Sequence, residues 1–196
     1  DDLRGRAATA LGRVFYRTSR HAEAEAAYRR ALALARARGD QEAEATATGY
    51  LGHVFDSQGR RTEAQEHYER CLALSREIGN RKFEASATAN LGNVFMTQGR
   101  VPEAQEHYER ALALLRETGD REGENRATGS LARVCFSQGR LPEAQEQYER
   151  SLALCREIGN REGEAYAQSS LADVHREQGE REGSEEQLRA CLALCE

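Results

Sequence analysis

The sequence predicts an all-α fold, a solenoid of stacked helical hairpins, and two observations carry this prediction. The first is a helical spacing of apolar residues, i, i+4, i+7 and i+8, at Ala87, Leu91, Val94 and Phe95. The second is a forty-residue repeat, marked by Leu11-Gly12, Leu51-Gly52, Leu91-Gly92, Leu131-Ala132 and Leu171-Ala172. A fixed period of this size is typical of repeat architectures, in which neighbouring units stack to bury a continuous core.

Residues 84–115 show one unit most clearly, because they hold two helical patterns separated by a glycine. The second pattern consists of Ala104, Tyr108, Ala111, Leu112 and Leu115. Gly99 is predicted to end the first helix, since glycine adopts the backbone conformation of a helix end without strain. Pro102 is predicted to lie in the first turn of the second helix, where no N–H donor is needed. The unit is therefore a helix-turn-helix hairpin.

In chain order, we expect a single array with repeats at about 1–40, 41–80, 81–120, 121–160 and 161–196. In the first repeat, the helices are expected at 3–16 and 22–37, and Ser19 stands where later repeats have glycine. The second, third and fourth repeats keep the pattern closely. In the fifth repeat, Gly183 and Ser184 disturb the start of the second helix and Leu188 replaces the tyrosine. We therefore expect this last helix to be held less tightly.

The connections between helices are short, which favours antiparallel neighbours. The repeats are joined by Gly-Asn-Arg or Gly-Asp-Arg, and the Asn or Asp side chain is predicted to cap the next helix. Acidic and basic residues at i, i+4 are expected to pair on the outer face of the second helices, as Glu66–Arg70, Glu106–Arg110 and Glu146–Arg150.

Composition excludes several classes of protein. There is no apolar run long enough to cross a membrane, and no targeting segment is visible. The net charge of −5 argues against nucleic acid as a partner, because phosphate binding requires clustered positive charge. Five cysteines without a disulfide-framework spacing indicate a reducing compartment, so we expect a cytoplasmic protein. The chain opens and closes inside helical patterns, from which we expect a fragment of a longer protein.

The pattern of small and apolar residues at Leu91, Gly92, Phe95, Ala104, Tyr108 and Ala111 resembles that of tetratricopeptide repeats, and the resemblance covers the whole chain. It implies a right-handed solenoid whose first helices line a concave groove and whose second helices form the convex back. The period is forty rather than thirty-four residues, and Arg76 and Arg116 replace the usual late proline. The longer unit resembles the Pins/LGN spindle-orientation adaptors, and arrays on bacterial signalling ATPases and caspase-like proteases.

Variation between repeats is concentrated on one face of the first helices, and this face is the candidate binding surface. The second helices are nearly copied, whereas the first helices differ at positions spaced by 4, 3 and 3 residues. Such variation is typical of a surface that reads a particular partner, although neutral drift on a solvated face would look the same. The candidate groove residues are Arg6, Arg13, Thr46, Tyr50, His53, Asp56, Ser86, Asn90, Asn93, Met96, Arg126, Ser130, Arg133, Phe136, Tyr166 and Asp173.

Within this set, Arg13, His53, Asn93, Arg133 and Asp173 form a ladder that is rich in hydrogen-bond donors. Such a ladder suits an acidic or carbonyl-rich peptide. The favoured function is therefore a protein-protein interaction module that binds a peptide or helical segment of a partner. The alternative is a ligand- or peptide-sensing arm of a larger signalling ATPase, protease or transcription regulator.

No combination of residues indicates catalysis, a metal or a cofactor, so we do not expect an enzyme. His67 and His107 occupy equivalent places in copied helices and are interpreted as solvent-facing. Cys191 and Cys195 stand at i, i+4, where they could share a metal with His175, but cysteine at position 191 replaces alanine of other repeats and is better explained as a small core residue.

The last helix should leave apolar residues without a further neighbour, at Leu188, Cys191, Leu192 and Leu194. Because solenoids generally need polar capping elements for solubility, we expect weak end-to-end self-association.

Overall fold

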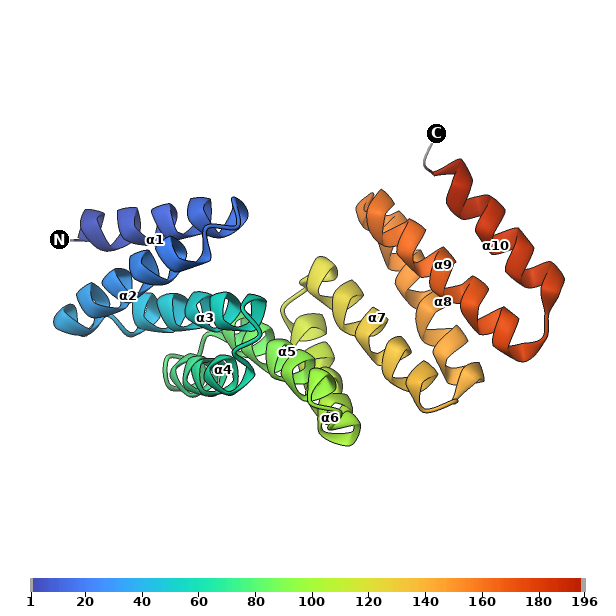
Figure 1. Ribbon diagram of the computed structural model, residues 1–196. Coiled ribbons are helices and arrows are strands. Elements are labelled where there is room, and N and C mark those ends of the chain that lie inside the picture. Colours follow the sequence, from blue (N-terminus) through green and yellow to red (C-terminus); the bar gives the residue numbers. More distant parts are fainter. Residues whose placement is uncertain (1, 195–196) are drawn as a thin grey trace. The chain divides into compact units, whose positions relative to one another are not determined.

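The computed structural model describes residues 2–194, and these residues form ten α-helices and no strand (Figure 1). The predicted fold class, an all-α solenoid of helix-turn-helix repeats, is confirmed. The helices are α1 (Asp2–Arg17), α2 (His21–Arg38), α3 (Gln41–Ser57), α4 (Arg61–Glu77), α5 (Arg81–Thr97), α6 (Val101–Glu117), α7 (Arg121–Ser137), α8 (Leu141–Ile158), α9 (Arg161–Gln178) and α10 (Arg181–Ala193).

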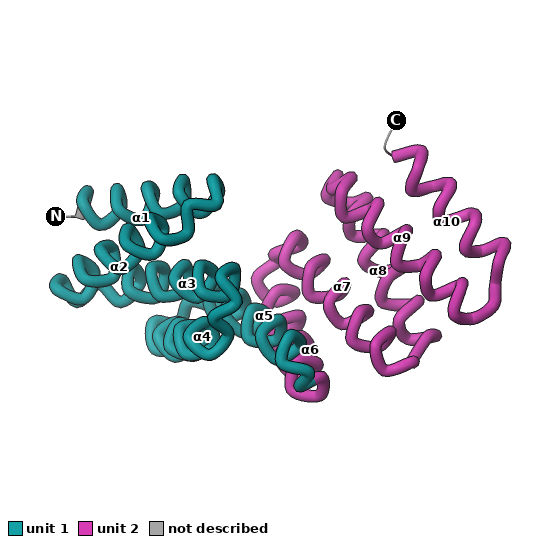
Figure 2. Tube along the Cα trace, viewed as in Figure 1, with its two compact units in different colours: residues 1–100 teal, residues 101–196 magenta. Residues whose placement is uncertain are grey.

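The chain divides into two compact units, residues 1–100 and residues 101–196, coloured teal and magenta in Figure 2. Unit 1 contains α1 to α5, and unit 2 contains α6 to α10. Within each unit, every helix packs chiefly against the helices that precede and follow it in the chain. The boundary falls between α5 and α6, the two helices of the third expected repeat.

The turns contain the helix caps and the glycine conformations that the sequence predicts. Between repeats, the side chains of Asp40, Asn80, Asp120 and Asn160 each accept a hydrogen bond from the backbone N–H three residues later. The predicted N-caps are thus confirmed. Within repeats, the turn glycines have positive φ, as at Gly59 with 73°. Ser19 adopts the same conformation with φ of 58°, and it is the only non-glycine residue with positive φ among those described.

The core is built from positions that recur in every internal repeat. Leu51 and Val54 are buried on α3, and so are their equivalents in the third, fourth and fifth repeats. The tyrosine of each second helix is buried beside them at positions 28, 68, 108 and 148. A Cβ atom at Gly52 would lie 2.6 Å from a ring carbon of Tyr68, so glycine permits this close approach of α3 and α4.

Arginine–carboxylate bridges connect successive repeats. Glu84 is buried at the start of α5 and accepts hydrogen bonds from Arg76 at 3.1 Å and Arg81 at 3.0 Å. Glu124 of α7 is held in the same way by Arg116 at 3.0 Å and Arg121 at 2.9 Å. The arginine that replaces the usual late proline therefore links one repeat to the next.

The i, i+4 pairs predicted for the second helices are wrong in two cases. Arg70 of α4 bonds to Glu44 of α3 at 3.3 Å, and Arg150 of α8 bonds to Glu124 at 3.4 Å. The physical reason is that a carboxylate with little access to water depends on protein donors, whereas an exposed pair along one helix gains little.

The two outermost helices are covered on one side only. α10 contains no buried residue, and Leu188 and Leu192 on it are exposed. On α1, Leu3, Leu11 and Val14 are exposed. The weaker hold on the last helix, which we expect from its divergent sequence, stays a prediction. Among the described helices, none combines the length and apolar character that a membrane span requires.

Candidate functional site

A cavity of about 210 Å³ lies between α3, α4 and α5 of unit 1. Its walls include five of the predicted groove residues, which two successive first helices bring together: Thr46, Tyr50, His53, Ser86 and Asn90. Its floor comes from the second helix between them, through Tyr68 and Cys71. The predicted convergence of variable positions from α3 and α5 is thus present in the structure of this unit.

The polar groups of this cavity are held by contacts with one another. The hydroxyl of Tyr68 lies 3.1 Å from Nδ1 of His53, and Nδ2 of Asn90 lies 3.5 Å from Nε2 of the same ring. Burial raises the pKa of the Tyr68 phenol, so its hydroxyl stays protonated and can donate to the imidazole. Tyr50 stacks on Tyr28 with ring centroids 5.0 Å apart, which fixes one wall of the cavity.

A larger cavity of about 810 Å³ lies between α1, α2 and α3. Arg6 and Arg13 of α1 line it, and Thr46 lines both cavities, so the two adjoin on the face of α1, α3 and α5. Half of the lining residues are apolar, and all of these except Leu3 are small: Leu3, Gly5, Ala7, Ala10, Ala31, Ala35 and Ala43. Arg38, Asp40 and Glu42 complete its rim. The cavity thus combines apolar side chains with charged side chains at its edge.

Three other predicted residues of unit 1 lie outside both linings. Asp56, Asn93 and Met96 are half-buried in the last turns of α3 and α5.

In unit 2, the predicted residues lie on α7 and α9, and most of them contact their own unit. Arg133 and Ser130 lie within reach of the Tyr108 hydroxyl, and Arg126 pairs with Glu122 at 3.5 Å. Phe136 packs against the core cluster formed by α7, α8 and α9. On α9, Asp173 pairs with Arg176 at 2.7 Å, whereas Tyr166 is exposed.

The sequence analysis did not identify the tyrosines that lie beneath the predicted groove residues. In the sequence, the tyrosines of the second helices belong to the apolar pattern of the repeat, yet the hydroxyls of Tyr68 and Tyr148 reach the first helices. Tyr68 contacts His53, and the hydroxyl of Tyr148 lies within hydrogen-bonding reach of Ser170. The signal available was spacing, because positions 50, 90, 130 and 170 each lie twenty-two residues after a tyrosine.

The histidines of the second helices are not solvent-facing as predicted. His67 is half-buried, its Nδ1 lies 2.9 Å from the carbonyl oxygen of Glu63, and its ring meets Phe55 edge-on at 4.8 Å. His107 makes the same contact with the carbonyl oxygen of Glu103. The apolar face is wider than the spacing indicated, so it partly covers the imidazole rings.

Cys71 agrees with the interpretation as a small core residue, whereas Cys191 is only half-buried on α10. Cys71 is buried and its Sγ lies 3.4 Å from the carbonyl oxygen of Ala45, while Cys191 makes the equivalent contact with Ala165. Cys195 lies outside the described residues. Across residues 2–194, no group of three or more His, Cys, Asp and Glu side chains is placed to hold a metal ion.

A tetratricopeptide repeat profile matches residues 3–77, 83–156 and 123–196, and a second such profile matches residues 50–114. No curated protein sequence matches the chain.

Solved structures with similar folds share less than a quarter of their residues with this chain. BtubC (BKLC) from P. vanneervenii has a TM-score of 0.84 at 22% identity, over 95% of this chain and 78% of that one. A P. anserina putative kinesin light chain with nearly identical TPR-like repeats has a TM-score of 0.76 at 21% identity, over 96% and 93%. A Rap protein complexed with competence and sporulation factor has a TM-score of 0.74 at 15% identity, over 99% and 64%.

These likenesses show the fold, and the profile matches extend over nearly all of the chain. Members of the matched family are generally non-enzymatic scaffolds for protein interactions. The chain belongs to the tetratricopeptide repeat family.

Proposed function

We propose that the protein binds an extended segment of a partner on the face of α1, α3 and α5. One observation carries the proposal: two cavities adjoin at Thr46, and their linings contain seven of the residues that vary between repeats. These residues are Arg6, Arg13, Thr46, Tyr50, His53, Ser86 and Asn90. Concave sites with an apolar lining and a few polar groups are typical of ligand binding.

The chemistry of the linings favours a segment with both acidic and apolar side chains. Arg13 is exposed at the edge of the larger cavity, where a guanidinium can pair with a carboxylate. The alanines beneath it leave room for a bulky apolar side chain of the partner. In the smaller cavity, Tyr50 offers an aromatic wall, and Asn90 offers an amide to the partner backbone.

Unit 2 carries its own version of this surface, in our proposal. Arg126 and Tyr166 are exposed on α7 and α9, and they would add charge and an aromatic ring to recognition. Ser130, Arg133, Phe136 and Asp173 would shape this surface rather than bind directly, since contacts within unit 2 already hold them. Asp56, Asn93 and Met96 would similarly flank the cavities of unit 1.

The Rap protein complexed with competence and sporulation factor supports this proposal, because a protein of similar fold holds a regulatory factor. The same observation favours the second candidate function, a sensing arm that regulates an attached ATPase, protease or transcription regulator. An adaptor of the Pins/LGN type remains the first candidate. In either role, we propose a cytoplasmic array of five repeats that belongs to a longer protein and acts on protein partners.

Selection from a displayed library of random peptides tests the first part of the proposal. We expect enriched peptides to combine acidic and bulky apolar residues. Arg13→Glu should weaken binding of an enriched peptide by about tenfold or more, because it replaces attraction by repulsion at the cavity edge. Raising the salt concentration should also weaken binding, since part of the attraction is between exposed charges.

Arg61→Glu is the matched control, because Arg61 is exposed at the start of α4 and lines neither cavity. This variant should bind the enriched peptide as the unchanged protein does. Equal loss in both variants would indicate a general effect of charge. Loss confined to Arg61→Glu would place the partner on another face and overturn the proposal.

A further inference from the structure

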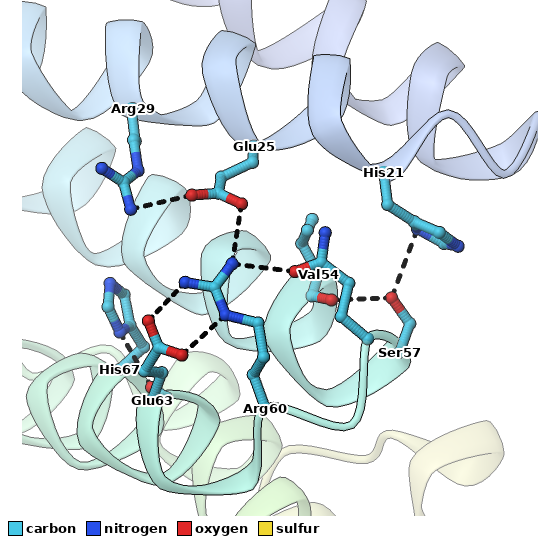
Figure 3. Close-up of polar contacts among 9 residues, drawn as sticks. His21, Glu25, Arg29, Val54, Ser57, Arg60, Glu63 and His67 are labelled. Atoms are coloured by element: carbon cyan, nitrogen blue, oxygen red, sulfur yellow. Dashed lines mark hydrogen bonds and ion pairs between the residues drawn. The ribbon is translucent and has the colours of Figure 1, made fainter.

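Three side chains between α7 and α8 form a hydrogen-bonded group that is closed off from solvent: Asn125 is 6% exposed, Ser151 5% and Cys155 0%. We call these three residues the buried triad. The polar contacts of Figure 3 differ in this respect, because Arg60 and Glu25, whose charged groups lie 3.0 Å apart, are both partly exposed. Water can replace a lost partner of Arg60, whereas the amide of Asn125 depends on partners from the protein.

Both ends of the Asn125 amide are bonded to α8. The hydroxyl of Ser151 donates to Oδ1 at 2.7 Å, and Nδ2 donates to Sγ of Cys155 at 3.1 Å. Burial raises the pKa of the Cys155 thiol, so this thiol stays protonated and neutral beside the amide. A Cβ atom at Gly163 would lie only 2.7 Å from the same Sγ, so α9 packs directly on the triad.

The triad is peculiar to the fourth repeat. The residues equivalent to Asn125 in the second, third and fifth repeats are alanine, and those equivalent to Ser151 in the other repeats are alanine or cysteine. In the second repeat, the thiol of Cys71 lies 3.4 Å from the backbone carbonyl oxygen of Ala45 at this position. Of the five second helices, α8 alone has a hydroxyl to donate to the amide oxygen.

The remaining surface of the second helices is nearly interchangeable. Residues 63–70, 103–110 and 143–150 share Glu-Ala-Gln-Glu, then His or Gln, then Tyr-Glu-Arg. A face copied in this way can pair with a first helix of another repeat or of another molecule, as in domain swapping. The amide of Asn125 distinguishes these helices. On α6, the equivalent positions hold Ala111 and Leu115, which would leave the amide buried without a hydrogen bond.

We propose that the buried triad specifies the pairing of α7 with α8 and thereby limits the exchange of hairpins between copies of this chain. A buried polar group without a partner costs more than a correct hydrogen bond gains, so the triad acts mainly against wrong pairings. Replacing all three residues by apolar ones should therefore keep stability and lose selectivity. The third repeat contains such an apolar version, with Ala85, Ala111 and Leu115 at the three positions.

The triple variant Asn125→Ala, Ser151→Ala and Cys155→Leu copies this apolar version into the fourth repeat. The larger side chain finds an equivalent setting, because Leu115 lies against Gly123 as Cys155 lies against Gly163. We expect the midpoint of urea unfolding to stay the same or rise, since no buried polar group is left without a partner.

Refolding of a mixture measures selectivity. Chains with two different tags are unfolded together in urea and refolded at high concentration, and dimers that carry both tags are captured and quantified. The triple variant should form about tenfold more of these mixed dimers than the unchanged protein, because a wrong pairing no longer leaves an amide unbonded. Mixing the two tagged chains after separate refolding should give none, since exchange of hairpins requires unfolding. Mixed dimers that form without unfolding would indicate surface association and overturn the proposal.

Leu131→Ala is the control for lost stability, because Leu131 is buried on α7 and its truncation leaves the triad intact. This variant should unfold at a lower urea concentration and still form mixed dimers only at the level of the unchanged protein. An equal rise in the control would assign the exchange to general instability. A triple variant that refolds without additional mixed dimers would show that the triad does not select the pairing. Either result would overturn the proposal.

Discussion

The tyrosine of each second helix shows how one residue serves both the core and the surface. Its ring is buried against the first helices, and at Gly52 it leaves no space for a Cβ atom. Its hydroxyl nevertheless contacts side chains on the groove face, such as His53. Burial raises the pKa of Tyr148 to about 12, so this hydroxyl remains a hydrogen-bond donor throughout the physiological range. A residue whose ring belongs to the core thus also supplies a polar group to the groove face.

A second residue-scale feature is the strained turn at Ser19. Replacing Ser19 by glycine should stabilise the protein by about 0.5–1 kcal/mol, because glycine removes the cost of the left-handed conformation but adds entropy to the unfolded chain. Denaturant unfolding measures the difference. Gly59→Ser is the reciprocal variant at the equivalent turn, with φ of 73°, and it should lower the free energy of unfolding by about 1 kcal/mol. A loss of stability in Ser19→Gly would contradict this account.

At the scale of the element, the start of each first helix carries the bridge to the preceding repeat. Burial by itself raises the pKa of the Glu84 carboxyl, but hydrogen bonds from Arg81 and Arg76 outweigh it, so the pKa lies below its usual range. The same balance lowers the pKa of Glu124. A carboxyl whose pKa is lowered on folding contributes stability above its unfolded pKa, and this contribution is lost as pH falls through the folded pKa.

Glu84→Gln should therefore lower the free energy of unfolding at pH 7 by about 1–3 kcal/mol, because it removes a buried acceptor of two charged donors. The difference from the unchanged protein should shrink as pH falls below about 4.3, the unfolded value for glutamate. Urea unfolding at several pH values measures both effects. Glu122→Gln is the control, since Glu122 is exposed, and it should change stability by less than about 0.5 kcal/mol. If the loss of stability in Glu84→Gln did not change with pH, the ion pairs of Glu84 with Arg76 and Arg81 would not be its source.

At the scale of the whole molecule, stability is local because each helix contacts mainly its chain neighbours. In such quasi-one-dimensional folds, the least covered elements open first. Amides of α10, which has no buried residue, should exchange with solvent at least about tenfold faster than those of α8. Hydrogen exchange by mass spectrometry measures this at low protein concentration.

Uniform protection of amides across the helices would contradict the prediction that α10 opens before the other helices.

The sequence alone determined the pairs of helices, the turns and the caps between repeats, and in the first repeat it placed the ends of both helices within one residue. These features depend on residues close in the chain, such as the turn glycines, the Asn and Asp caps, and the helical spacing of Leu and Val. It also placed the variable residues on the first helices, seven of which line the two cavities of unit 1.

Only the tertiary structure decided which partners those side chains take. Arg70 bonds to Glu44 rather than to its own helix, His67 lies partly under the apolar face, and Phe136 packs into the core. These outcomes depend on distances between helices that are separate in the chain, and spacing along one helix does not contain that information.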